Sequence, residues 1–381
     1  MSQTASLSKY SGHGKLFLAL EMGWETWKLA FSTGLGQEIW QVSIPARSQQ
    51  RLGVAMDRAR KRFGLSEGCE VVSCYEAGRD GFWVDRWLRS LGIRNLVVDS
   101  SSIEVKRRAR RVKTDRIDAR KLVTMLMRYE AGEGRVWSVV RVPSAMQEDA
   151  RHLHRELRTL KKEQTRLINR IKGLLASQGV DGRMGRRGLL KPLEMERTWD
   201  GSPLPEGMRR RLELEVERHA FVHRQVLGLE AQVKRMMRKS SEAAVADVRR
   251  LASLRAIGRD GATILIREFG WRDFRNRRQV GSLVGLTPTP FQSGKSFREG
   301  GISRAGNRHV RGVIVDLAWS WLRLQPGSEL SCWYRRRFAS GSSRIRRIGI
   351  VAMARKLLIA LWRYWAQGRM PQGAVLKSKA A

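Results

Sequence analysis

Several residue types are scarce in this chain of 381 residues. It has three cysteines, Cys69, Cys74 and Cys332, whose spacing fits neither a zinc site nor a disulfide framework, so a reducing cytoplasm is expected. The polar stretch from Met1 to Lys15 lacks the apolar core of an export signal. Long apolar runs are also missing: the C-terminal segment 348–365 is interrupted by basic residues, which argues against a membrane span.

Acidic residues are outnumbered. The chain carries 74 lysines and arginines against 36 aspartates and glutamates, a formal charge of +38. Such an excess calls for a polyanionic partner, and nucleic acid is the natural one. A solvated charged face, a ribosome-associated role or an acidic membrane surface are the alternatives from composition alone. The densest predicted contacts are Arg107, Arg108, Arg110, Arg111 and Lys113.

The length and the patterning together predict three parts. Residues 1–143 alternate between strand-like and helix-like segments, which is typical of a mixed α/β domain. Residues 144–245 contain two long runs with helical spacing, 147–177 and 209–238, which predict a spacer or coiled coil. Residues 246–381 are predicted to be mostly helical, with a loop over 285–307, a helix over 308–324, a basic loop and a final basic helix.

Four carboxylates in the first part fall where a metal site could form. Glu21 follows the first apolar strand, Glu76 ends a later strand, and Asp115 and Asp118 open a helix three residues apart, on one face. Paired magnesium ions in DNA phosphoryl transfer need such converging oxygen ligands. Taken singly, each residue has a structural alternative as a helix cap, a turn residue or the partner of an arginine.

The segment 285–308 has the composition of an active-site loop. It holds Ser293 before a glycine, which is typical of an exposed and accessible turn, and Ser282, Ser296 and Ser303 are competing candidates. Basic or amide side chains nearby could hold a phosphodiester: Lys295, Arg298, Arg304, Asn307 and Arg308. Ser293 is otherwise an ordinary turn residue. Gly294-Lys295-Ser296 lacks the earlier glycine of a phosphate-binding P-loop, since Thr289 stands there, so ATP use is not supported.

The sequence resembles insertion-sequence-110-type transposases, relatives of the Piv and MooV DNA invertases. The resemblance is carried by Glu76-Ala-Gly, the run Lys113 to Ala119 and the serine loop, which occur in this order around a helical spacer. The resemblance implies an RNase H-like, RuvC-type first domain with a DEDD motif. It assigns Glu76, Asp115 and Asp118 to the second, third and fourth acidic positions. The first is usually aspartate, but no aspartate precedes Asp57, so Glu21 or, less well placed, Glu25 must stand in.

The resemblance also implies an activity. Family members cut and rejoin DNA through a serine nucleophile, which Ser293 matches, with Mg²⁺ at the carboxylates. A structured non-coding RNA guides them to donor and target DNA, and the domains of different protomers meet in a homo-oligomer, a dimer that assembles into a tetramer. We therefore expect a transposase of the bacterial cytoplasm or nucleoid. A RuvC-like nuclease without serine chemistry and a non-catalytic nucleic-acid-binding protein are the alternative functions.

Overall fold

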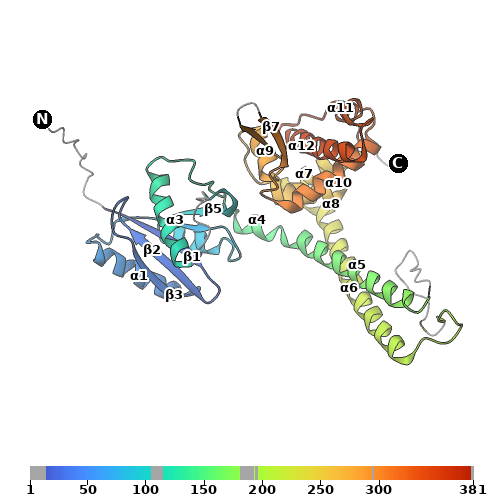
Figure 1. Cartoon of the computed structure of the whole chain (residues 1–381), viewed down its shortest axis with the longest axis horizontal. Coiled ribbons are helices and arrows are strands. Elements are labelled where there is room, and N and C mark those ends of the chain that lie inside the picture. Colours follow the sequence, from blue (N-terminus) through green and yellow to red (C-terminus); the bar gives the residue numbers. More distant parts are fainter. Residues whose placement is uncertain (1–13, 104–114, 181–192, 194–195, 294–295, 379–381) are drawn as a thin grey trace. The chain divides into compact units, whose positions relative to one another are not determined.

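The computed structural model describes residues 14–103, 115–180, 193, 196–293 and 296–378 (Figure 1). Of residues 101, 115–117, 291–293 and 296–299 only the backbone is described. The chain divides into two compact units, Met1–Pro143 and Ser144–Ala381, and each is treated by itself. None of the described helices is long and apolar enough to cross a bilayer.

The N-terminal unit is built on a five-stranded mixed sheet of order β3-β2-β1-β4-β5. The first three strands form an antiparallel meander, and β4 and β5 run parallel to β1. The strands are β1 (Lys15–Met22), β2 (Thr26–Ser32), β3 (Trp40–Pro45), β4 (Glu70–Glu76) and β5 (Arg94–Val98). The parallel pairs require crossover connections, which the intervening helices provide.

Helices cover both faces of this sheet. On one face Leu16, Leu18 and Leu20 pack with the apolar sides of α1 (Gln49–Arg62) and α2 (Trp83–Ser90). On the other face Phe17 and Ala19 pack with α3 (Asp115–Glu130). The strict alternation of β1 between the two cores is the period-two pattern of a strand buried on both sides. A short 3₁₀ turn, η1 (Ser100–Ser102), follows β5.

The C-terminal unit begins with a helical arm. A short helix, α4 (Ala145–Asp149), ends before the long α5 (His152–Ala176), which pairs with α6 (Glu206–Lys239). Buried positions recur at intervals of three, four or seven residues, as in coiled coils: Leu157, Leu160, Leu167 and Ile171 on α5, and Leu212, Glu215, His219, Val222 and Val226 on α6. The charge of Glu215 is answered by Arg170, whose guanidinium nitrogen lies 2.9 Å from the carboxylate.

The rest of this unit is a mostly helical domain, as predicted. Its core gathers side chains from most of the helices that follow the arm, and the C-terminal end of α6 packs into the same core through Met237. The elements are α7 (Ala243–Ala252), α8 (Arg259–Leu265), η3 (Ile266–Gly270), α9 (Arg277–Leu283), β6 (Pro288–Ser293), β7 (Ser296–Ile302), α10 (Arg308–Leu324), α11 (Glu329–Phe338) and α12 (Ser343–Gln367).

Two expectations for this region were wrong. The segment predicted as a long loop, 285–307, contains a β-hairpin of β6 and β7. The prolines at 288 and 290 obscured the strand because they cannot donate to a ladder, but a two-stranded hairpin consists of edge strands, where proline is tolerated. The segment predicted as a basic loop contains α11, whose N-cap Ser328 accepts a hydrogen bond from the Ser331 amide.

Candidate active-site elements

Glu21 and Glu76 lie side by side at one edge of the N-terminal sheet. Leu20 and Tyr75 are register partners in the parallel pair of β1 and β4, and each glutamate is the next residue along its strand. Neighbouring strands are about 4.8 Å apart. Because side chains alternate along a strand, Glu21 continues the series Phe17 and Ala19 and thus shares the face that packs against α3.

Ion pairs fix the direction of α3 across that face. Glu130, in its last turn, pairs with Lys15 at the start of β1, where the Nζ and Oε2 atoms are 3.6 Å apart. Arg94, at the start of β5, also pairs with Glu130. The C-terminal end of α3 therefore lies at the strand starts, and its N-terminal end lies at the strand ends.

The lengths of strand and helix agree. From Lys15 to Glu21 the strand rises about 20 Å, and from Glu130 back to Asp118 the helix rises about 18 Å. Asp118 is one turn before Leu122, which is buried against the sheet, so it lies on the helix face toward β1 and β4. The structure thus brings Glu21, Glu76 and the first turn of α3 to the same edge.

The described side chains at this edge are half-buried carboxylates, whose oxygen atoms could act as metal ligands. Glu21, Glu76 and Asp118 are all partly accessible, and Glu21 has polar interactions within the protein. The side chain of Asp115 lies outside the described residues. Among the described side chains, no three histidine, cysteine or acidic groups are grouped closely enough to hold a metal ion.

Asp99 is a further carboxylate at this edge that the sequence did not single out. It follows β5 directly, and the last residue of that strand, Val98, is the register partner of Glu76. Its side chain is half-buried and has polar interactions of its own. The signal was present in the sequence as an acidic residue at a strand end, the same criterion that selected Glu76.

In the C-terminal unit, the predicted serine lies near the tip of the β6–β7 hairpin. Ser293 is the last residue of β6 and is the register partner of Ser296. The side chains of Ser293 and Arg298 are outside the described residues, as is Lys295 altogether. Ser303, a competing candidate, lies at the hairpin base, where its amide donates to the Thr287 carbonyl at 2.8 Å.

The base of the hairpin is held closed by its backbone. The backbone amide of Asn307 donates to the carbonyl of Leu283 at 2.9 Å, and the backbone amide of Arg304 donates to the carbonyl of Gly285 at 3.1 Å. Gly306 has a φ of +84°, and a Cβ there would be 2.2 Å from the Leu283 carbonyl oxygen. Only glycine tolerates both the conformation and the close approach. The hairpin therefore projects from a rigid base.

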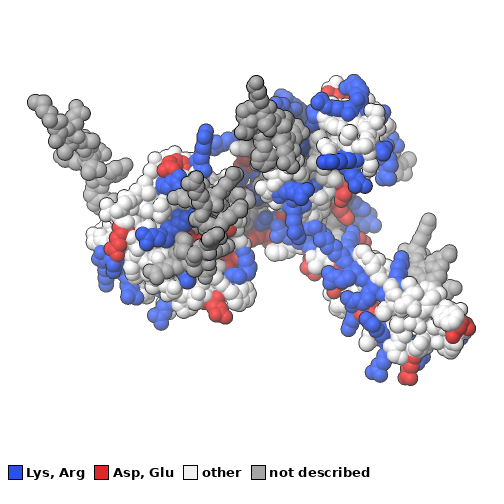
Figure 2. All heavy atoms as spheres, in the orientation of Figure 1, with Lys and Arg blue, Asp and Glu red and all other residues white. Residues whose placement is uncertain are grey.

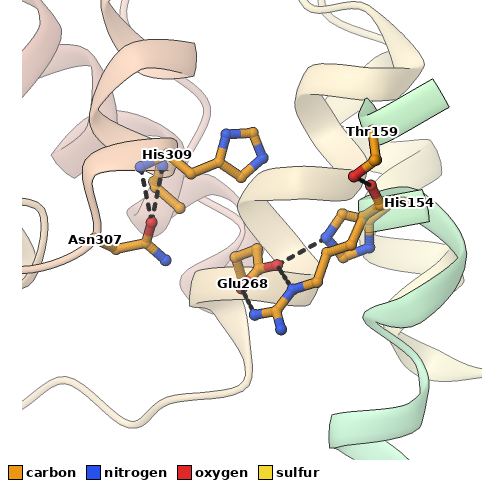
Figure 3. A network of polar contacts seen from close by, with 7 residues as sticks. His154, Thr159, Glu268, Asn307 and His309 are labelled. Carbon is orange, nitrogen blue, oxygen red and sulfur yellow. Dashed lines mark hydrogen bonds and ion pairs between the residues drawn. The ribbon is translucent and has the colours of Figure 1, made fainter. Parts of the chain in front are cut away.

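Asn307 joins this base to the next helix. Its Oδ1 accepts hydrogen bonds from the amides of His309 and Val310, at 3.0 and 3.1 Å, and so caps α10 (Figure 3). Asn307 was predicted to contact nucleic acid, but its oxygen serves the helix. The contact with nucleic acid stays a prediction, and the side-chain amide nitrogen of Asn307 would have to make it.

A buried acid lies at the junction of α5 and the C-terminal core. Glu268, on the π-helical turn η3, is held by Arg155, with Oε1–Nε and Oε2–Nη2 distances of 2.6 and 2.7 Å, and by His154 Nε2 at 3.0 Å (Figure 3). Burial would raise the pKa of Glu268, but the hydrogen bonds from Arg155 and His154 outweigh burial and hold it well below its usual range. The carboxylate is therefore charged and accepts from all three donors.

Comparison with known proteins decides the family. Residues 248–331 match the model of the family described as "Transposase IS116/IS110/IS902 family". A putative transposase y4rJ of Sinorhizobium fredii (strain NBRC 101917 / NGR234) is 38% identical over 379 residues, 96% of this chain and 95% of that protein. The transposase for insertion sequence element IS1111A of Coxiella burnetii is 25% identical over 260 residues, 68% of this chain and 67% of that protein.

This chain belongs to the IS116/IS110/IS902 transposase family. The resemblance that the sequence motifs indicated is thus confirmed, and the enzyme is a transposase, which transfers phosphoryl groups of DNA. The stretch that matches the family model includes the β6–β7 hairpin, Glu268 and Asn307.

Basic side chains of the transposase cover much of the surface that can be seen. On the face in Figure 2, lysines and arginines follow the α5–α6 arm and spread over the C-terminal helices. Exposed examples on α5 are Lys162, Arg166 and Lys172. Of the predicted nucleic-acid contacts, Arg304 and Arg308 are exposed, whereas the five at 107–113 lie outside the described residues.

A pocket of about 390 Å³ opens on the same arm of the transposase. One face of α5 contributes most of its wall, and α6 and α8 complete it. Its positive charge comes from Arg158, Lys161 and Lys162, of which Lys161 is paired with Asp260 at 3.3 Å. Among the described residues, Arg158 and Lys162 have no ion pair, so their charge is available to a phosphate group.

Proposed function

We propose that this transposase cuts DNA at the C-terminal edge of the N-terminal sheet, in a domain of the RNase H-like, RuvC type. The observation that carries the proposal is the meeting of Glu21, Glu76 and the first turn of α3, with Asp115 and Asp118, at one edge. Two strands running parallel and a helix running against them bring together residues almost one hundred positions apart. The strand order β3-β2-β1-β4-β5 suits this fold.

The donor set fits magnesium. All four proposed ligands, Glu21, Glu76, Asp115 and Asp118, are carboxylates, the hard oxygen donors that this ion prefers. When bound, Mg²⁺ would orient the phosphodiester and favour ionisation of the attacking hydroxyl. The glutamate at the first position carries one methylene more than aspartate, so it sets its oxygens farther from the strand.

We further propose Ser293 as the nucleophile. Its Oγ would bond to phosphorus while one bridging P–O bond of the strand breaks, and the departing sugar oxygen would take up a proton as the serine gives one up. The phosphoserine bond conserves the energy of the phosphodiester, so rejoining needs no ATP. The rigid base of the β6–β7 hairpin supports this role, because a nucleophile must be held in position.

Guidance by a structured non-coding RNA and assembly into a dimer or tetramer are also part of the proposal. They rest on the family resemblance and on the charge of +38, which suits an RNA and two DNA duplexes together. In such a complex base pairing would read the sequence, and basic side chains such as Arg158 and Lys162 would hold phosphates.

The test is a cleavage assay on DNA from the ends of the element, with magnesium and the flanking non-coding RNA, followed by mass analysis for DNA joined to protein. We expect an adduct at Ser293 in the unaltered enzyme. Asp118→Asn should lower both adduct formation and recombination by at least about 100-fold, and Ser293→Ala should abolish both.

Other outcomes point to the alternative functions. Nicking without an adduct, sensitive to Asp118→Asn but not to Ser293→Ala, indicates a RuvC-like nuclease. An adduct at Ser282, Ser296 or Ser303 reassigns the nucleophile. If no cleavage occurs at all, Glu21→Asp tests whether the substituted ligand is the cause, and continued inactivity indicates a nucleic-acid-binding protein.

A further inference from the structure

Trp24 is exposed at the turn between β1 and β2. Its side chain is 65% accessible, whereas Trp27, three residues later, is buried in the core at 1%. An exposed indole contributes nothing to the core and is by itself common on protein surfaces, so the groups around Trp24 decide what its ring can do. Exposed aromatic rings beside cations are the usual means by which proteins stack unpaired bases.

Two arginines hold the Trp24 ring. The guanidinium carbons of Arg47 and Arg79 lie 4.9 and 4.6 Å from the ring centroid, within the range of cation–π attraction. Arg47 Nη1 also donates to the Trp24 carbonyl at 3.2 Å. The ring is therefore fixed in position although it is exposed.

Asp80 anchors both arginines. Its oxygens accept from Arg47 Nη2 at 2.9 Å and from Arg79 Nη2 at 3.1 Å, and its side chain is only 4% accessible. The two arginines keep 41% and 49% of their own side chains accessible. Two positive charges against one negative leave a net positive charge beside the ring, which suits a phosphate.

The backbone of Arg47 is strained in this arrangement. Its φ of +63° is in the left-handed region, which costs a non-glycine residue on the order of 1 kcal/mol or more. Such strain persists only when the surroundings over-determine it, and it is concentrated at functional sites. Here the bonds to Trp24 and Asp80 hold the residue in place.

This cluster of Trp24, Arg47, Arg79 and Asp80 lies at the same edge of the sheet as Glu21 and Glu76. Trp24 is three residues beyond Glu21, past the end of β1, and Arg79 is three residues beyond Glu76, past the end of β4. Three residues of fully extended chain span at most about 10 Å. The cluster is therefore within a short distance of the proposed cutting site.

We propose that Trp24 stacks on the base of an unpaired DNA nucleotide next to the phosphodiester held at Glu21 and Glu76, while Arg47 and Arg79 contact its phosphate. The location beside the cut rests on the proposed function of the carboxylate edge. A stacked base would hold an unpaired strand beside the cut without reading its sequence.

The test measures binding of short single-stranded DNA to the full chain, in EDTA and at a salt concentration that brings the affinity into range. Trp24→Ala should weaken binding by about 5-fold to about 150-fold, the effect of one lost stacked base. Trp24→Phe, which keeps an aromatic face, should retain most of the affinity, and Trp24→Leu should behave like alanine. Trp199→Ala is the matched control, because Trp199 is 83% exposed and has no cation–π contact among the described residues.

A strand with abasic positions separates stacking from a structural role. The unaltered protein should lose affinity for this strand, and Trp24→Ala should lose little more. Equal loss on normal and abasic strands, unchanged binding by Trp24→Ala, or a loss seen with RNA and not with DNA would each overturn the inference. The assay contains no magnesium, so failure of the proposed function appears separately, as absent cleavage by an enzyme whose binding still depends on Trp24.

Discussion

Burial and neighbouring cations act on His309 in the C-terminal unit of the transposase. Its ring is half-buried in the first turn of α10, and in Figure 3 it projects into the space between α10 and α5. Burial lowers its pKa to about 4, and Arg158, His154 and Lys162 add to the effect, with Glu268 acting in the opposite direction. The folded protein therefore keeps this ring neutral.

This environment predicts a dependence of stability on pH. An unfolded histidine has a pKa near 6.5, so between about pH 6.5 and pH 4 the unfolded chain binds a proton that the folded chain does not. Stability from a neutral His309 is thus present above pH 6.5 and is lost as the pH falls toward 4. His309→Gln cannot titrate, so the melting temperature of the unaltered protein should fall more steeply over this range, by about 2–4 °C. If the melting temperatures of the unaltered protein and of His309→Gln fell equally from pH 7.5 to pH 5, the ring would not be held neutral.

At the scale of elements, the hairpin that carries Ser293 depends on its glycine base. Gly306→Ala places a Cβ against the Leu283 carbonyl in a left-handed conformation, so we expect a loss of about 1–3 kcal/mol in the free energy of unfolding, measured by denaturant titration. The recombination activity should fall by more than the loss of folded protein explains, because the base of the hairpin can no longer close. The control is Gly312→Ala, on the exposed face of α10 with open space around it, where alanine should stabilise by up to about 1 kcal/mol. If both variants behaved alike, the close contact at Gly306 would be unimportant.

The elements also show which parts of the fold are predictable from sequence. Strands β1 and β4 follow from short, mostly apolar segments, and α10 agrees with the helix expected over 308–324. An acidic residue at each of two strand ends predicted the carboxylate edge. The β6–β7 hairpin has neither signal. The long run predicted from 147 to 177 is divided in the structure: α4, which begins with the capping box of Ser144 and Gln147, ends at Asp149, and α5 begins at His152.

Contacts between distant segments were beyond prediction. Glu268 meets Arg155 across 113 positions, and its π-helical turn has no sequence signature. The cluster around Trp24 joins three loops that become neighbours only after the sheet has formed. Periodicity reports which face of one element is buried, but it does not say which loops meet at the edge of a sheet.

At the scale of the whole molecule, the described residues form separate cores. Two hydrophobic clusters lie within the N-terminal unit, one on each face of the sheet, and three lie within the C-terminal unit. The α5–α6 arm belongs to the C-terminal unit. Met237 joins the C-terminal end of α6 to the core of this unit, and the ion pair with Glu268 joins the N-terminal end of α5 to it. Each unit therefore has what an independently folding domain needs.

We accordingly expect fragments 1–143 and 144–381 to fold alone. Each should unfold cooperatively, and its melting temperature should fall within about 4 °C of one of two transitions of the full chain, measured by calorimetry at one salt concentration because the charge makes stability depend on ions. A fragment that is unfolded by itself would mean that the units stabilise each other. Two independent transitions would instead mean that Glu21 and Glu76 keep their places at the sheet edge without help from the unit that carries Ser293, so substitutions in either unit should leave the melting of the other unchanged.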